Sequence, residues 1–323
     1  MAANTPGGGL EERTFATAGE LLAALDLATA DWMDARGAHC PWIFRGQNDA
    51  NWRLEPPAWR GSPASPPPPI ARMLAALRRF PFRAPPPFGH AGPDHELLML
   101  RLAELAVVAA FLTLADDLGI ATPGHDRVPM PFDATDPQWM SEAIDVAQPY
   151  VWDAGRQIWD LKPESFADNA AFALAQHHRI PTRLLDWTRD PLVAAYFAAE
   201  GAVADGGQLA VWAVHRDTVR RCRQIAICRV PRSEIEFIHA QSGLFLVHVG
   251  EAGHWNTHRS WPDLLPPLLA APGPPVRKYM LPRAQAPELS RMLWRRRISR
   301  AHMMPSYDSV ALALQRQWEL LDG

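Results

Sequence analysis

The chain contains little cysteine, no long uninterrupted apolar segment and no large excess of charge. Its three cysteines have no Cys-x-x-Cys spacing, so neither a disulfide framework nor a cysteine-rich zinc site is expected. No apolar run approaches the roughly 20 residues of a membrane-spanning helix. The first residues also lack the basic and apolar pattern of a signal peptide. With a net charge of −3, a nucleic-acid coat and a membrane-surface protein are both disfavoured. We therefore expect a cytoplasmic globular protein without a metal ion.

Proline, in contrast, is abundant, at 32 of 323 residues. Two clusters of it, near residues 61–93 and 250–276, are expected to be surface inserts, because proline is excluded from helix interiors and central strands. The rest of the chain is predicted to be a disordered leader (1–13), a single domain (14–317) and a short tail (318–323).

The apolar spacing predicts helices early in the chain and strands concentrated later. Helices are expected at residues 14–33, 70–79, 95–118, 169–177, 190–199 and 286–297. Strands are expected at residues 42–45, 182–185, 208–214, 225–230, 243–249 and 278–281. This order favours an α+β fold with a mixed, largely antiparallel sheet and flanking helices.

The first informative segment places an arginine directly after three large apolar residues. Arg45 follows Trp-Ile-Phe and precedes Gly46, which is expected to end the strand and to let a ligand or another backbone approach. A buried guanidinium needs a partner, and its shape suits phosphate or carboxylate. Arg45 therefore either binds a ligand or pairs with an internal acid such as Glu104 or Asp186. Gln47 extends the same candidate site.

The second informative segment covers residues 175–188 and combines polar groups with large apolar side chains. Adjacent histidines cannot share one helix face, so they do not form an i, i+4 metal pair. Instead, an amide and one histidine are expected to reach into a cleft whose floor is residues 182–188. The candidates here are Gln176, His177, His178, Thr182, Arg183, Asp186, Trp187 and Thr188.

A strand followed at once by a helix is expected at the end of that segment. Asp190 is the predicted N-cap and Pro191 the first helical residue, so free amides and the helix dipole favour an anion there. Trp187 either stacks on a base or belongs to the core. Asp186 either faces the ligand or pairs with Arg183 or Arg45, and for both residues the two roles are compatible.

Two later features complete the candidates. Gln241, at the start of a predicted strand, is expected to enter the same cleft. The arginines between residues 291 and 300 either bind a polyanion or form a solvated helix face.

These motifs together resemble the FRG family, named for the Phe-Arg-Gly seen here at residues 44–46. The resemblance extends over residues 37–315, and its most specific part is Ala175-Gln-His-His followed by Ile-Pro-Thr-Arg-Leu-Leu-Asp-Trp-Thr188. Glu104 with Phe111 is similar to the family's first helix. One departure is Arg179, which stands where the family usually has glycine. The resemblance implies a bacterial or phage-related protein, often found beside toxin or antiphage defence genes.

The layout of the family resembles ADP-ribosyltransferase-like folds. That likeness implies that Arg45 holds a nicotinamide dinucleotide and that residues 186–196 form the nicotinamide wall. Such enzymes commonly use a glutamate on a late strand, for which Glu234 and Glu236 are loose candidates here and Glu104 is another.

The leading hypothesis is therefore an effector enzyme, a transferase that uses NAD for ADP-ribosyl transfer or NAD cleavage. One of His177, His178, Asp186, Gln241 or Glu104 would support the chemistry. A protein or nucleic-acid acceptor is a possible partner. Two alternatives stay open: a ligand-sensing or partner-binding module without turnover, and a nucleic-acid phosphodiesterase that uses the two histidines.

Overall fold

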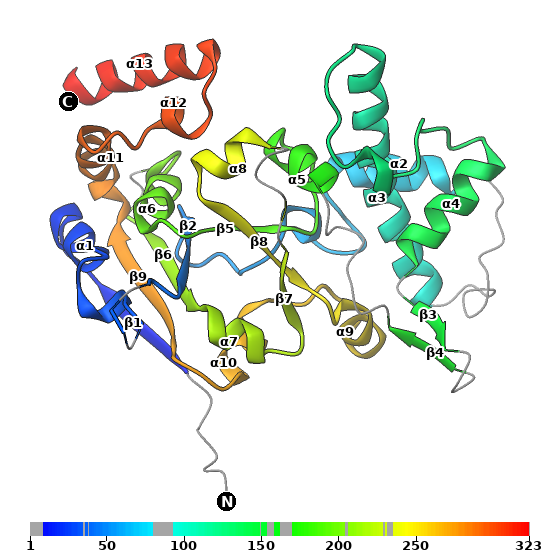
Figure 1. Ribbon diagram of the computed structural model, residues 1–323, viewed down its shortest axis with the longest axis horizontal. Coiled ribbons are helices and arrows are strands. Elements are labelled where there is room, and N and C mark those ends of the chain that lie inside the picture. Colours follow the sequence, from blue (N-terminus) through cyan, green and yellow to red (C-terminus); the bar gives the residue numbers. More distant parts are fainter. Residues whose placement is uncertain are drawn as a thin grey trace, which may run out of the picture.

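A seven-stranded sheet organises the molecule (Figure 1). The computed structural model describes residues 9–34, 36–37, 39–79, 93–148, 150–153, 158–161, 170–203, 206–228, 230 and 235–322. The order of the sheet is β1-β9-β6-β2-β5-β8-β7. Its strands are β1 (Leu10–Thr14), β2 (Trp42–Gln47), β5 (Leu185–Thr188), β6 (Gln208–His215), β7 (Ile225–Cys228), β8 (Gly243–His248) and β9 (Val276–Pro282). A separate hairpin pairs β3 (Tyr150–Asp153) with β4 (Ile158–Leu161).

Only β1 and β9 run parallel, and every other neighbouring pair in the sheet is antiparallel. The prediction of an α+β protein with a mixed, mostly antiparallel open sheet and flanking helices is confirmed.

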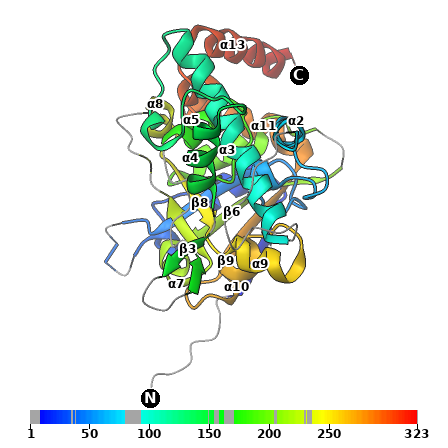
Figure 2. The same cartoon turned by 90° about the vertical axis from the view of Figure 1, so that its right-hand side faces the viewer.

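Helices cover both faces of the sheet. One layer contains α1 (Ala18–Ala24), α6 (Pro191–Ala199) and α11 (Ala286–Arg295). The other contains α2 (Pro68–Leu77), α3 (Pro93–Asp117), α4 (Pro137–Ala147) and α5 (Ala170–His177), which lie in front of the sheet in Figure 2. The remaining α-helices are α7 (Arg216–Arg221), α8 (Glu236–Ala240), α9 (Glu251–His258), α10 (Leu265–Ala270), α12 (Arg300–Met303) and α13 (Tyr307–Asp322). Short 3-10 turns are η1 (Ala30–Trp32), η2 (Pro57–Trp59), η3 (His125–Arg127) and η4 (Arg283–Gln285).

The central strand β6 shows how the sequence builds both layers. Side chains alternate across a strand, so each face of β6 collects every second residue. Leu209, Val211 and Ala213 pack with α1, α6 and α11. The intervening Ala210, Trp212 and Val214 pack with the layer that contains α3. β6 is therefore buried on both faces and lies between two hydrophobic cores.

The long helix α3 differs from the expectation that no apolar run approaches membrane-spanning length. Its segment His95–Asp117 contains an 18-residue window with a mean hydropathy of 2.1 and is long and apolar enough to cross a membrane. However, 78% of the apolar window is buried inside the protein. Because α2, α4 and α5 pack around it, α3 needs no continuous polar face, and its composition is typical of a core helix.

Several predicted boundaries also differ from the structure. The predicted leader (1–13) overlaps β1, which is ordered because it pairs with β9. The region 250–276, expected to be irregular, contains α9 and α10, and prolines are tolerated in the first turn of α10. The predicted tail (318–323) continues α13 as far as Asp322.

The strand expected at 182–185 begins three residues later, as β5. Side chains bind the backbone N–H groups that precede it: Arg183 N donates to Glu104 at 2.8 Å, and Leu184 N donates to Thr182 Oγ1 at 3.3 Å. These groups are therefore not available to a sheet ladder.

Candidate functional site

Strand β2 positions Arg45 by simple alternation. Trp42 and Phe44 pack into the core beside α6, whereas Ile43 packs into the opposite core. Arg45 follows Ile43 on that opposite side, next to the neighbouring strand β5. The strand thereby directs one charged side chain away from the α6 layer.

Gly46 lies inside β2 and does not end it, so the expected strand break is wrong. A Cβ atom at this position would lie 2.0 Å from the carbonyl oxygen of Ala194 and 2.5 Å from the backbone nitrogen of Ala198. Both atoms belong to α6. Of the two approaching groups considered for Gly46, a ligand or another backbone segment, the structure places the backbone of α6 there.

Arg45 contacts Asp186 on the adjacent strand β5. Its Nη1 donates to the carbonyl oxygen of Asp186 at 2.7 Å and lies 3.8 Å from the carboxylate oxygen Oδ2. Nε of Arg45 is buried and has no hydrogen-bond partner. Burial lowers the pKa of Arg45 from its usual value to about 10; Asp186 opposes this shift and Arg60 adds to it. Arg45 thus stays charged at neutral pH, and Asp186 compensates its positive charge only in part.

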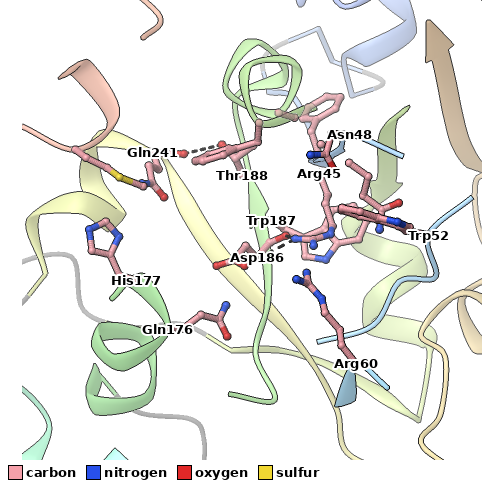
Figure 3. A pocket seen from close by; sticks show the side chains of 16 residues that line it. Arg45, Asn48, Trp52, Arg60, Gln176, His177, Asp186, Trp187, Thr188 and Gln241 are labelled. Atoms are coloured by element: carbon pink, nitrogen blue, oxygen red, sulfur yellow. Dashed lines mark hydrogen bonds and ion pairs between the residues drawn. The ribbon is translucent and has the colours of Figure 1, made fainter. Parts of the chain in front are cut away.

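A pocket of about 290 Å³ opens beside this pair (Figure 3). Its lining comes from β2, β5, α5, α6 and the segments after β2, α8 and α12: Phe44, Arg45, Gly46, Gln47, Asn48, Trp52, Arg60, Gln176, His177, Asp186, Trp187, Thr188, Ala194, Phe197, Gln241 and Met304. These residues include two arginines but only one carboxylate, that of Asp186, which is 57% exposed. The charge balance of the pocket therefore favours an anionic ligand.

Gln176 presents an unused hydrogen-bond donor to this pocket. Its Oε1 accepts a hydrogen bond from Thr182 Oγ1 at 2.5 Å, which fixes the orientation of the amide. Its Nε2 is buried and has no partner. Thr182 itself is fully buried and does not line the pocket, so it acts on the site through Gln176.

The two adjacent histidines have different surroundings. His177 lines the pocket and stacks on Phe237, with ring centroids 3.4 Å apart. Burial, helped by the positive fields of His178 and Arg300, lowers the pKa of His177 to about 4. His178 is exposed and does not line the pocket. At neutral pH the pocket therefore contains one uncharged imidazole.

Helix α5 ends in a Schellman motif, which fixes the backbone that carries Gln176, His177 and His178. Ile180 N donates to the carbonyl of Ala175, and Arg179 N donates to that of Gln176, both at 2.9 Å. Arg179 takes the left-handed conformation (φ = 67°) that favours glycine. The turn thus forms even though the residue departs from the glycine expected here.

Three predicted polar residues use their side chains within the protein. Gln47 accepts from Trp212 Nε1 at 2.7 Å and donates to the carbonyl of Arg53 at 3.0 Å. Thr188 Oγ1 donates to the Gln241 carbonyl at 2.7 Å, and Gln241 Nε2 donates to the Met303 carbonyl at 3.2 Å. These bonds join the pocket wall to neighbouring segments, including the one that follows α11.

The tryptophan most accessible to a ligand is Trp52, not Trp187. Trp187 contributes to the pocket wall but is only 3% exposed and belongs to the core, the second of its two predicted roles. Trp52 also lines the pocket and is 49% exposed. An exposed indole at a pocket wall is suited to stacking on a ring.

Glu104 and Arg183 lie in a buried ion network outside the pocket. Arg183 Nη2 lies 2.7 Å from Glu104 Oε2, and its Nη1 lies 2.7 Å from Glu251 Oε1. Glu251 also pairs with Arg101. Burial alone would lower the pKa of Arg183, but Glu104 and Glu251 outweigh it and raise that pKa. Of the partners considered for Asp186, the structure therefore places Arg45 next to it and Arg183 elsewhere.

The other acidic and basic candidates contribute little to this pocket. Glu236 begins α8, and Glu234 lies outside the described residues. None of the arginines between residues 291 and 300 lines the pocket; Arg291 pairs with Glu288, and Arg300 pairs with Glu200. No group of three or more potential metal ligands occurs in the described part of the chain.

Sequence reasoning assigned no role to several pocket residues: Asn48, Trp52, Arg60, Phe197 and Met304. Trp52 lies five residues after β2, and its position shortly after the Phe-Arg-Gly segment was the available signal. Arg60 and Met304 carry no such signal, because only the fold brings them to Arg45 and Gln241.

Comparison with known proteins identifies part of the chain. Residues 132–206 match the FRG domain, and this stretch contains Gln176, Asp186 and helix α6. The match is narrower than the expected 37–315 and does not reach the Phe-Arg-Gly segment at residues 44–46. No curated protein and no solved structure matches the chain. The ADP-ribosyltransferase-like fold is thus not shown by any structural match.

Proposed function

We propose that the pocket binds a phosphate-bearing nucleotide, and that this nucleotide is NAD. The observation that carries the proposal is the combination of Arg45 and Arg60 with a single, half-exposed carboxylate among the described residues that line one cavity. Guanidinium groups bind phosphate well, and their charges are not balanced here. The exposed indole of Trp52 supplies a stacking surface, and Gln176 Nε2 supplies a donor for a carboxamide oxygen.

Asp186 is the group that we assign to chemistry at the glycosidic bond. When the bond from the ribose carbon to the nicotinamide nitrogen breaks, its electron pair goes to the ring, and positive charge develops on the sugar. The Asp186 carboxylate stabilises that charge. A water or another acceptor hydroxyl then forms the new C–O bond and gives its proton to Asp186. Water gives NAD cleavage, and a macromolecular acceptor gives ADP-ribosyl transfer.

A ligand-sensing module without turnover is the second candidate, and one observation favours it. Arg45 already binds the Asp186 carbonyl, and Asp186 is the only carboxylate among the described residues that line the pocket. The phosphodiesterase alternative draws less support, since only His177 lines the pocket and its pKa of about 4 leaves it uncharged at neutral pH.

Nicotinamide release from NAD tests the proposal. We expect the purified protein to release nicotinamide and the Asp186→Asn variant to lose about 100-fold or more of the rate. Arg60→Ala should weaken NAD binding about tenfold or more, because a charged contact to phosphate is lost. Arg295→Ala removes an exposed arginine that does not line the pocket and is the matched control.

Calorimetry with NAD separates the two candidates. Binding without release, with Arg60→Ala still weakening it, would support the sensing module over the enzyme. Absence of both release and binding would overturn NAD as the ligand.

A further inference from the structure

A second cavity, of about 360 Å³, adjoins the pocket. Its lining residues are Gln47, Asn51, Trp52, Arg53, Glu55 and Arg60. Three of them, Gln47, Trp52 and Arg60, also line the first pocket. Because both ends of the Gln47 amide are bonded within the protein, Trp52 and Arg60 form the part of the shared wall that a ligand can use.

The two arginines of the second cavity have different partners. Arg53 Nε lies 3.2 Å from Asp263 Oδ2, and its Nη1 lies 3.4 Å from Glu55 Oε1. Two carboxylates therefore share the charge of Arg53. In the described part of the chain no carboxylate lies within ion-pair distance of Arg60. The uncompensated positive charge thus lies at the boundary between the cavities.

Glu55 supplies an unused acceptor to the second cavity. Its side chain is 13% exposed, and Oε1 has no hydrogen-bond partner although Arg53 lies nearby. Burial raises the pKa of Glu55, and the cations Arg53 and Arg60 offset this only in part. A buried carboxylate oxygen in this state is stabilised by a ligand that brings hydroxyl or amine donors.

We propose that the second cavity binds a second nucleotide unit, so that the two cavities together hold one dinucleotide. This inference rests on the proposed function and specifies where the second nucleotide unit of its ligand lies. A dinucleotide such as NAD carries its negative charge on the linking pyrophosphate, between its two nucleosides. Arg60 lies at the corresponding place, between one cavity that contains Asp186 and Gln176 and another that contains Glu55.

The sizes of the cavities agree with this division. At about 290 and 360 Å³, each lies near the lower end of the 300–1,000 Å³ typical of ligand pockets. Each suits one nucleotide unit better than two. Trp52, exposed on the shared wall, can stack on a base. The ribose hydroxyls of the second unit would donate to Glu55 Oε1.

Calorimetry with three compounds tests the inference: NAD, nicotinamide mononucleotide and adenosine monophosphate. Wild-type protein should bind NAD at least tenfold more tightly than nicotinamide mononucleotide. Glu55→Gln should weaken NAD and adenosine monophosphate about tenfold and leave nicotinamide mononucleotide unchanged. Glu142→Gln, which changes an exposed glutamate on α4, should alter none of the three.

Other outcomes overturn the inference in distinguishable ways. Equal affinity for NAD and nicotinamide mononucleotide, or an equal effect of Glu55→Gln on both, would overturn the second cavity as a nucleotide site. The first pocket would remain the proposed binding site. If neither compound binds, the proposed function fails and this inference fails with it. Should Glu55→Gln not fold, Asn51→Ala tests the same cavity, because Asn51 is exposed and lines only that side.

Discussion

Two arginines, one from each of the two informative segments of the sequence, have opposite surroundings in the structure. Arg183 is 1% exposed and lies between Glu104 and Glu251, which raise its pKa. Arg45 has one half-exposed carboxylate, Asp186, and a second arginine nearby, and its pKa falls to about 10. The first guanidinium is compensated inside the protein, whereas the second borders an open cavity.

This difference distinguishes a structural arginine from one that we propose to bind a ligand. Both are buried guanidinium groups in apolar surroundings. In the sequence, each is an arginine beside large apolar residues, so the sequence does not separate them. What differs is the balance of charge and the presence of unused polar atoms. The buried network contains two arginines and two glutamates, while the pocket has Arg45 Nε and Gln176 Nε2 without partners.

The largest expected effect comes from unbalancing the buried network. Glu104→Gln keeps the shape of the side chain but removes a charge that compensates Arg183. We expect the free energy of unfolding to fall by about 3–5 kcal/mol, as when one partner of a buried pair is removed. Urea denaturation measures this. The exposed change Glu142→Gln should stay within about 0.5 kcal/mol; a similar small loss in Glu104→Gln would contradict the structural role of the network.

A second change acts on the frame of the pocket and leaves the network intact. In Gly46→Ala the new methyl group would overlap backbone atoms of Ala194 and Ala198, so β2 and α6 must separate. We expect a loss of about 1–3 kcal/mol or more, typical of overpacking. Gly253→Ala is the matched control, because no atom lies within 4 Å of a Cβ there and its φ is not positive. Equal losses in both variants would mean that the contact with α6 is not the cause.

The pH dependence of stability offers a third comparison, with one histidine in each region. Burial lowers the pKa of His177, in the pocket, and of His248, beside Glu251, from 6.5 to about 4. The unfolded chain therefore binds protons more readily than the folded protein. Stability should be complete above about pH 6.5 and fall as the pH drops from there toward 4.

Urea denaturation at pH 7 and pH 5 measures this loss, and NMR titration assigns it to individual histidines. His248→Gln should reduce the pH dependence more than His177→Gln, because His248 is only 2% exposed. A phosphate-bearing ligand should raise the pKa of His177 and leave that of His248 unchanged. Equal shifts at both histidines would indicate a general change in the protein and not occupation of the pocket.

The smallest expected effect is on stability when a cation is removed from the pocket. Arg60→Ala relieves repulsion of Arg45, so the free energy of unfolding should stay constant or rise by a few tenths of a kcal/mol. Thermal unfolding without ligand, beside the control Arg295→Ala, checks this. Destabilisation well above 1 kcal/mol would place Arg60 with the structural arginines.

The sequence predicted much of the local structure correctly. The expected cap and first residue of α6 are confirmed, since the Asp190 side chain accepts from Leu192 N and Pro191 begins the helix. These features depend on neighbouring residues, as does the alternation that directs Arg45 away from α6. The sequence left open whether Arg183 or Arg45 is the ion-pair partner of Asp186, and the structure places Arg45 next to it.

Long-range contacts explain what the sequence did not predict. Arg183 bonds Glu104, 79 residues earlier, and Glu251, 68 residues later, in a segment whose prolines suggested an irregular loop. The apolar pattern of α3 does not indicate that Glu104, on this helix, pairs with Arg183. The second cavity likewise depends on the path of the chain after β2, where no periodic pattern exists.

The contact between Gly46 and α6 also restricts how related sequences can vary. A clash between two side chains can be relieved by shrinking either one, so such positions change in pairs. Here the obstructing atoms are the Ala194 carbonyl oxygen and the Ala198 backbone nitrogen, and every residue carries these two backbone atoms. No substitution on the helix can make room for a larger residue at position 46. This position is therefore closed to compensatory change, whereas the arginines and carboxylates around the cavities remain free to be exchanged together.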